Sequence, residues 1–158
     1  HPSWSTAQVL AAATREWEAA AMKLLITTIQ FVKQIRPKLK VAMYDYPVRA
    51  YWNGYNSSSG AQLRADNDRM MNLFCHVDGL FPSVYQFYDS KGSPAIVKAN
   101  TEYVFTNVQE AVRIAKEVPK KCASKTSPLP VWVYAWLRYH AAGLPFVSFF
   151  FFCWRFYS

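Results

Sequence analysis

The hydrophobic and polar positions of the chain fall into alternating helix-like and strand-like stretches. From about residue 6 to residue 35, apolar side chains recur at spacings of three and four residues among many alanines, which is typical of an amphipathic helix. Pro37 disfavours helical backbone at Arg36, so we expect this helix to end there. The same spacing predicts two further helices, from about 61 to 76 and from about 99 to 118.

Three short runs of apolar and aromatic residues lie between or after these helices and predict strands at residues 41–46, 79–87 and 130–136. Pro82 interrupts the second run, so the strand proper could begin only at Ser83. Strands separated by helices are joined by crossovers and run parallel. We therefore expect an α/β fold with about three parallel strands, and two architectures fit: a doubly wound open sheet, or part of a (β/α) barrel.

Composition and charge narrow the class of protein. The chain has 158 residues, of which 52% are hydrophobic and 18% charged, and this excludes a disordered tail. Eighteen Lys and Arg against ten Asp and Glu give a net charge of +8, which suits a polyanionic partner or simply a basic surface. We expect no nucleic-acid binding, because the basic residues form no stripe. The apolar run Leu144–Trp154 has eleven residues, too few for a membrane span.

Several common kinds of reactive site have no signature in the sequence. None of the five glycines has the spacing of a phosphate-binding loop, and the three cysteines and three histidines lack metal-ligand spacing, so we expect no cofactor and no metal. Cys75 precedes His76, but neighbours on a helix diverge by about 100°. A buried thiol at Cys75 is therefore the favoured interpretation.

Two groups of carboxylates have expected positions. Asp45 falls at the carboxyl end of the first strand, where barrel enzymes build their active sites. Asp66 and Asp68 are expected in the first turns of the second helix, where negative charge suits the helix dipole. Asp45 alone is no acid–base pair.

Tyrosines gather near the predicted strand ends. A tyrosine offers a flat apolar face to a sugar ring and a hydroxyl to its polar edge. The alternative is that these are core aromatics whose hydroxyls reach the rim. The candidates are Tyr44, Tyr85, Tyr134 and, just beyond the last strand, Tyr139.

Four stretches together resemble the hyaluronidases, glycoside hydrolase family 56. The run R-A-D-N-D at 64–68, continuing to L-F-P-S-V-Y at 80–85, is similar to that family's R-A-x-N-D … A-L-Y-P-S-I-Y. Arg36-Pro37 followed by residues 43–47 resembles R-P … F-Y-x-F-P. Residues 108–115 resemble the R-V-x-E-A-x-R-V helix, and residues 129–134 resemble the next strand. The resemblance covers roughly residues 11 to 140.

The resemblance implies a partial, TIM-barrel-like (β/α) barrel over residues 1–140, followed by an unmatched Phe-rich tail at 141–158. It also implies an enzyme that cleaves β-1,4 hexosaminidic bonds of hyaluronan or chondroitin, with the substrate's own N-acetyl group as nucleophile. Tyr44 and Tyr85 match the family tyrosines that contact this group, and Tyr139 would line the same groove. Asp45 and Tyr134 complete the expected substrate-binding set.

The chain also departs from the family pattern. The family's acidic D-x-E motif would precede the first helix, and this chain begins after it, so we expect an internal piece that has no catalytic residue and is inactive alone, from a protein that is a monomer when complete. Residues 48–51 lack a loop cysteine of the family, and Asn107 replaces an Arg. The alternative is a non-catalytic relative that binds glycans or polyanions. Asn56-Ser57-Ser58 is a glycosylation acceptor, consistent with an extracellular or lysosomal protein.

Overall fold

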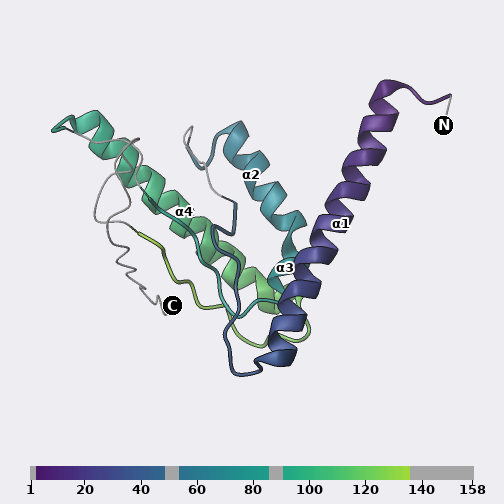
Figure 1. Ribbon diagram of the computed structural model, residues 1–158. Helices are drawn as coiled ribbons and strands as arrows, with labels where there is room; N and C mark the ends of the chain where they lie inside the picture. Colours follow the sequence, from purple (N-terminus) through teal and green to yellow (C-terminus); the bar gives the residue numbers. More distant parts are fainter. Residues whose placement is uncertain (1–2, 49–53, 86–90, 136–158) are drawn as a thin grey trace, which may run out of the picture. The chain divides into compact units, whose positions relative to one another are not determined.

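The computed structural model describes residues 3–48, 54–85 and 91–135, which form two compact units, His1–Val41 and Ala42–Ser158 (Figure 1). We describe each unit by itself. The predicted site residue Tyr139 and the Phe-rich tail lie outside the described residues. Within the described part, the helices include none that is long and apolar enough to cross a bilayer.

The first unit holds one long helix, α1 (Thr6–Ile35), with the bounds that the apolar spacing predicts. Ser5 caps its start: the Ser5 hydroxyl accepts the Gln8 amide, and the Gln8 side chain accepts the Ser5 amide at 2.8 Å. At the other end the Arg36 amide donates to the Val32 carbonyl at 2.8 Å before Pro37 stops the helix. Four large side chains spaced seven residues apart are largely exposed on α1: Leu10, Trp17, Leu24 and Phe31.

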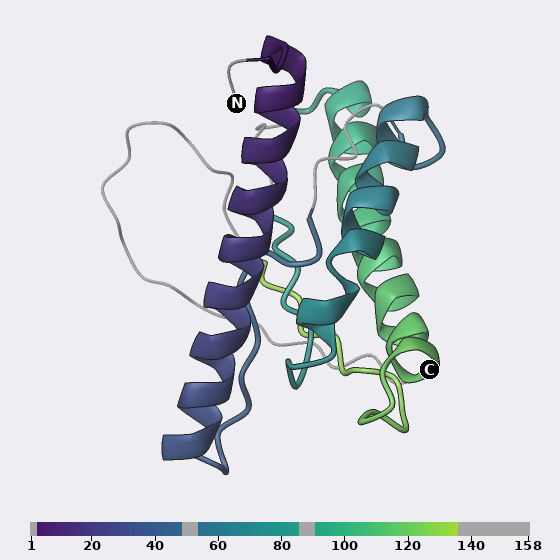
Figure 2. The same cartoon turned by 90° about the vertical axis from the view of Figure 1, so that its right-hand side faces the viewer.

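The second unit contains α2 (Ser58–Arg69), the single turn α3 (Met71–Phe74) and α4 (Pro94–Lys121). Helices α2 and α4 lie side by side in both views (Figures 1 and 2). The Ser57 hydroxyl accepts the Gly60 amide and starts α2 three residues before the predicted boundary, and the helix breaks at Met70. Asp66 and Asp68 consequently lie near the end of α2, so the prediction that they complement the dipole at its start is wrong.

Three extended segments of the second unit run parallel: residues 42–46, 80–84 and 130–134. They meet in isolated bridges, Tyr44 with Phe81, Leu80 with Val131 and Ser83 with Tyr134, so residues 80–84 lie between the other two. The predicted parallel pairing is confirmed, but the described residues contain short bridged segments instead of strands of the expected length. Pro82 is one reason, because it has no amide hydrogen to donate within the middle segment.

The core of the second unit is built from α3, α4 and the parallel segments. Leu73 and Phe74 of α3 and Val118 of α4 are almost completely buried, as is Leu80 of the middle segment. Gly79 is required beside this core: a Cβ there would lie 2.1 Å from the Trp132 ring. The helices and the segments thus form two layers with apolar side chains between them.

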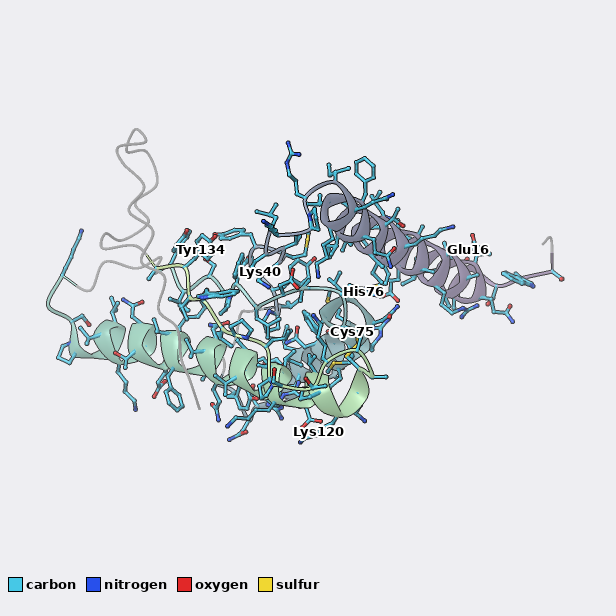
Figure 3. The ribbon with its side chains drawn as sticks, turned by 90° about the horizontal axis from the view of Figure 1, so that it is seen from below. Glu16, Lys40, Cys75, His76, Lys120 and Tyr134 are labelled. Atoms are coloured by element: carbon cyan, nitrogen blue, oxygen red, sulfur yellow. A yellow bond between two sulfur atoms is a disulfide. The ribbon has the colours of Figure 1, made fainter. Side chains whose placement is uncertain are left out.

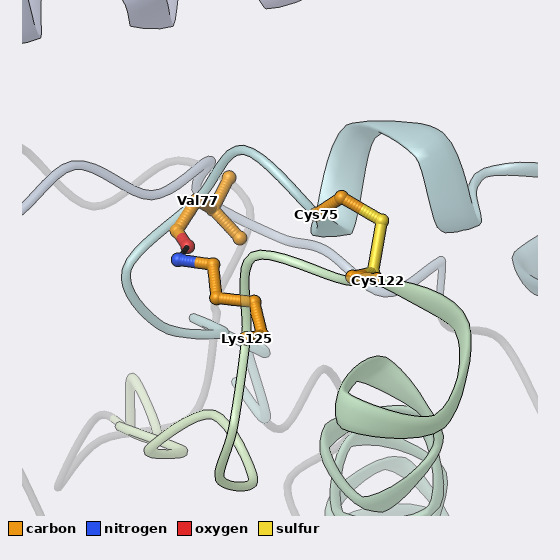
Figure 4. Close-up of a disulfide and its surroundings, with 4 residues drawn as sticks. All are labelled: Cys75, Val77, Cys122 and Lys125. Atoms are coloured by element: carbon orange, nitrogen blue, oxygen red, sulfur yellow. Dashed lines mark hydrogen bonds between the residues drawn. A yellow bond between two sulfur atoms is a disulfide. The ribbon is translucent and has the colours of Figure 1, made fainter.

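A disulfide joins Cys75, just after α3, to Cys122 at the end of α4 (Figures 3 and 4). The favoured interpretation of Cys75 as a buried thiol is therefore wrong. Nearby, the Lys125 ammonium donates to the Val77 carbonyl at 2.7 Å and lies 3.8 Å from the Asp78 carboxylate. These contacts fix the turns that precede the second and third parallel segments.

Candidate active site

Three of the predicted tyrosines meet at one end of the parallel segments. The Tyr44 ring lies 5.3 Å from the Tyr134 ring, edge to face, and 6.3 Å from the Tyr85 ring. Backbone pairing aligns them, because Tyr44 bridges Phe81 and Tyr134 bridges Ser83. In Figure 3, Tyr134 lies well away from Cys75 and Lys120, which mark the carboxyl-terminal end of α4. We call Tyr44, Tyr85 and Tyr134 the tyrosine cluster.

The hydroxyl of Tyr44 has a defined orientation. It donates to the Ser83 hydroxyl at 3.1 Å, and Ser83 is completely buried between the segments. Tyr44 itself is 48% exposed, so part of this residue is accessible to a ligand. A phenol whose proton is already donated can still accept a hydrogen bond. The cluster therefore offers aromatic faces together with at least one oriented acceptor.

Asp45 follows Tyr44 at the point where the first segment turns. Its amide donates to the Phe81 carbonyl at 2.9 Å, and its φ is 67°, in the left-handed region that Asp tolerates better than most residues. The backbone thus leaves the layer directly after the Tyr44–Asp45 pair. This places Asp45 at the end of the segment, as the sequence predicts.

A second polar cluster surrounds Glu110 of α4, which is completely buried. Its Oε1 accepts from Asn67 Nδ2 at 2.9 Å and from Arg113 at 2.8 Å, and its Oε2 accepts from the Tyr55 hydroxyl and from Arg113, both at 2.7 Å. We call these four residues the Glu110 cluster. A buried carboxylate needs such partners, because leaving it unpaired costs several kcal/mol.

Neighbouring groups extend the Glu110 cluster across α2. Arg113 also donates to the Asp68 carboxylate at 2.8 Å and to the Arg64 carbonyl at 3.3 Å. The Arg64 guanidinium lies 4.5 Å above the Tyr55 ring and donates to the Tyr55 carbonyl. Gly60 lets the Tyr55 carbonyl lie against the start of α2, because a Cβ at residue 60 would lie 2.3 Å from the Tyr55 carbonyl oxygen.

The electrostatics of the Glu110 cluster follow from these contacts. Burial raises the pKa of Tyr55 to about 12, and the hydrogen bond to the Glu110 carboxylate adds to the shift. The hydrogen bond to Glu110 also raises the pKa of the Arg113 guanidinium, against the opposing effect of its burial. Arg113 thus stays charged against the Glu110 carboxylate at 2.7 Å, and Tyr55 stays neutral beside it.

The structure brings together Tyr44, Tyr85 and Tyr134, with Asp45 adjacent in sequence, whereas Tyr139 lies outside the described residues. Asn56 is exposed in the turn before α2. In the part of the chain that the structure describes, His, Cys, Asp and Glu side chains do not gather in threes as a metal site would require.

Sequence reasoning missed the Glu110 cluster as a functional unit. Three of its four members do lie in stretches singled out from the sequence: Asn67 in R-A-D-N-D at 64–68, and Glu110 and Arg113 in the helix at 108–115. The available signal was an acidic and a basic residue three apart, Glu110 and Arg113, on a helix whose buried face they share.

Comparisons with known proteins agree with these observations. A family model described as hyaluronidase matches residues 1–148. Hyaluronidase-2 of Rattus norvegicus is 30% identical over 121 residues, which are 73% of this chain and 25% of that protein. Chondroitin hydrolase of Caenorhabditis elegans is 30% identical over 128 residues, or 77% of this chain and 26% of that protein. The chain thus spans about a quarter of the length of these curated relatives.

The structural comparison gives the same family. The crystal structure of bee venom hyaluronidase in complex with a hyaluronic acid tetramer matches with a TM-score of 0.70 and 30% sequence identity, covering 89% of this chain and 40% of that one. A monoclinic crystal structure of bee venom hyaluronidase matches with a TM-score of 0.69 and 28% identity, covering 89% of this chain and 42% of that one.

Proposed function

Because this chain belongs to the hyaluronidase family, we propose that it is part of a glycosidase that cleaves the β-1,4 hexosaminidic bonds of an acidic polysaccharide, hyaluronan or chondroitin. The observation that carries the proposal is the tyrosine cluster, in which the Tyr44 ring lies 5.3 Å from the Tyr134 ring and 6.3 Å from the Tyr85 ring at the end of parallel segments. Barrel enzymes bind their substrates at the carboxyl ends of parallel strands. We propose accordingly that the segments are part of a (β/α) barrel.

Charge and the relatives support the substrate class. The bee venom enzyme was crystallised with a hyaluronic acid tetramer, and the relative in Caenorhabditis elegans is named a chondroitin hydrolase. Both polysaccharides are polyanions with N-acetylated sugars. The net charge of +8 on this chain favours association with such a polymer.

In the proposed reaction, the carbonyl oxygen of the substrate's acetamido group attacks C1 of its own sugar while the bond from C1 to the leaving oxygen breaks. An acidic side chain gives its proton to that leaving oxygen, and water then opens the cyclic intermediate with retention of configuration. Tyr44 accepts the acetamido N–H, because its own proton is donated to Ser83. Tyr85 donates to the acetamido carbonyl, and Tyr134 and Asp45 bound the same site. Holding the amide in this way favours a near-attack geometry.

The proton donor in this proposal lies outside the 158 residues, in a D-x-E motif of the family that would precede α1. Glu110 does not fit this role, because it is completely buried and both of its oxygens accept hydrogen bonds from Arg113, Asn67 and Tyr55. The chain alone should therefore bind the polysaccharide without cleaving it. The second candidate function is a non-catalytic glycan-binding relative, which the tyrosine cluster fits equally.

We also propose that the protein works outside the cell or in a lysosome and carries a glycan on Asn56. The Cys75–Cys122 disulfide supports this compartment, because such bonds form and persist in oxidising environments. Asn56 is exposed, so its amide is accessible for modification. Removal of N-linked glycans from the secreted protein, followed by mass measurement, tests this part of the proposal.

The test of the binding site is calorimetric titration of the 158-residue chain with a hyaluronic acid tetramer. Tyr44→Phe and Tyr85→Phe should each weaken binding, since each removes one hydroxyl while keeping the ring. Phe105→Leu, which alters an exposed aromatic of α4, is the matched control and should leave the affinity unchanged. Unchanged affinity in both tyrosine variants would refute the site.

Reducing-end assays on hyaluronan separate the two candidate functions. The 158-residue chain should release no new ends. Release by this chain would refute the placement of the acid outside it. The longer protein that includes the segment upstream of α1 should cleave if the protein is an enzyme, whereas binding without cleavage by that longer protein would favour the glycan-binding relative.

A further inference from the structure

The Glu110 cluster holds the chain on both sides of residues 49–53, which follow the segment of Tyr44. On one side, Asn67 binds the backbone of Val48 at both of its polar atoms: Asn67 Oδ1 accepts the Val48 amide at 2.7 Å, and Asn67 Nδ2 donates to the Val48 carbonyl at 3.2 Å. On the other side, the Tyr55 hydroxyl binds Glu110 directly at 2.7 Å. A single buried carboxylate thus connects the described residues on both sides of 49–53 to α4.

Glu110 also determines which way the Asn67 amide faces. Asn67 Nδ2 donates to Glu110 Oε1 at 2.9 Å. Turning the amide by half a rotation would place its oxygen against the Glu110 carboxylate, where two acceptors repel each other, and would break both bonds to Val48, because its N–H group can only donate and its carbonyl can only accept. Arg113 holds the carboxylate in turn, through two hydrogen bonds of 2.7 and 2.8 Å. Arg113 therefore orients the Glu110 carboxylate, Glu110 orients the Asn67 amide, and Asn67 holds the backbone of Val48.

Val48 is four residues after Tyr44, and only Asp45, Tyr46 and the buried Pro47 lie between them. On the near side, Tyr44 is fixed by its bridge to Phe81 and by its hydrogen bond to Ser83. The Asp45 amide donates to the Phe81 carbonyl, and on the far side the backbone of Val48 is held by two hydrogen bonds to Asn67 of α2. Since Tyr44 is half exposed, this second anchor limits how far its ring can move.

From this geometry we infer that Glu110 is a positioning residue for carbohydrate binding: acting through Asn67 and Val48, it holds Tyr44 in the orientation that a bound N-acetylated sugar requires. The inference rests on the proposed function of the tyrosine cluster. Glu110 itself touches no sugar, because it is completely buried. Binding groups must be held within about 0.5 Å of their productive positions, so a loosened Val48 should weaken binding even though Tyr44 is intact.

The test replaces Glu110 by glutamine, which keeps the size of the side chain and one acceptor oxygen but presents an amide nitrogen to one of its present donors. We expect the Kd for the hyaluronic acid tetramer to rise about tenfold, as a displacement of binding groups by a fraction of an ångström would produce. Hydrogen exchange of the Val48 amide should become faster, and the ring resonances of Tyr44 should shift. Glu117→Gln, on the same helix but paired with Lys120 at the surface, is the matched control and should change none of the three readouts.

A folded Glu110→Gln variant that retains both the wild-type Kd and slow Val48 exchange would overturn the inference. If that variant does not fold, Asn67→Ala provides the same test, because it removes the link to Val48 while leaving the Glu110–Arg113 pair. An Asn67→Ala variant that binds the tetramer with the wild-type Kd would equally overturn the inference. The proposed function fails if the wild-type chain does not bind the tetramer or if Tyr44→Phe binds it normally. In either case the Val48 exchange rates and the Tyr44 resonances of the Glu110→Gln variant still decide whether Glu110 positions Tyr44.

Discussion

Removal of the Cys75–Cys122 disulfide should cost much of the stability of the second unit. The two residues are 47 positions apart, and closing a loop of that length in the unfolded chain is worth ~4 kcal/mol in the chain-entropy model. For a domain of this size, that loss corresponds to a Tm lower by about 8–16 °C. The magnitude is large because the bond connects the end of α4 to the turn after α3, so it encloses the middle parallel segment.

The measurement compares Cys75→Ser/Cys122→Ser with its parent by urea unfolding, both in a Cys153→Ser background that prevents exchange with the third cysteine. The parent should have no reactive thiol, and the unsubstituted protein should have one of its three cysteines free. Two reactive thiols in the folded parent would show that the bond does not form. A difference in unfolding free energy below ~1 kcal/mol would refute the loop-closure reasoning.

Three further predictions concern the Glu110 cluster and its surroundings. The raised pKa of Tyr55 contributes stability that is complete below pH 10 and is lost as the pH rises toward 12, because only the unfolded state ionises Tyr55 in that window. Phenolate absorbance of the folded protein should show one tyrosine that titrates late, and Tyr55→Phe should abolish this signal. Gly60→Ala should destabilise by about 1–3 kcal/mol in urea unfolding, because the new Cβ would meet the Tyr55 carbonyl, whereas helix propensity alone predicts stabilisation. Arg113→Met should cost about 3–5 kcal/mol in the same assay by leaving the Glu110 charge buried and unpaired, while Glu117→Gln should change the unfolding free energy by at most about 0.5 kcal/mol.

Patterns in the sequence predict those features of the fold that depend on residues close to one another along the chain. The bounds of α1 follow from apolar spacing and from Pro37, and the parallel pairing follows from strands that alternate with helices. The approach of Tyr44, Tyr85 and Tyr134 follows from their positions at the ends of those runs. Whether they bind a sugar stays a prediction.

Contacts between distant parts of the chain could not be predicted in the same way. The Cys75–Cys122 bond spans 47 positions, and spacing alone does not reveal which of three cysteines pair. The start of α2 was placed too late because its first turn is polar, and the Ser57 cap decides the boundary. Pairing of Glu110 with Asn67 requires knowing that α2 and α4 pack together, which is information about the fold and not about either helix.

The saturation of Glu110 has an evolutionary consequence. Both Glu110 oxygens accept hydrogen bonds, four in all, from the side chains of Tyr55, Asn67 and Arg113. A change at any one of the four residues therefore leaves a charge or a donor unpaired in the protein interior. Tyr55, Asn67, Glu110 and Arg113 should therefore vary as a group across homologues, either all retained or all replaced together. Lineages that have replaced the set would also be those in which Asn67 no longer holds the backbone of Val48.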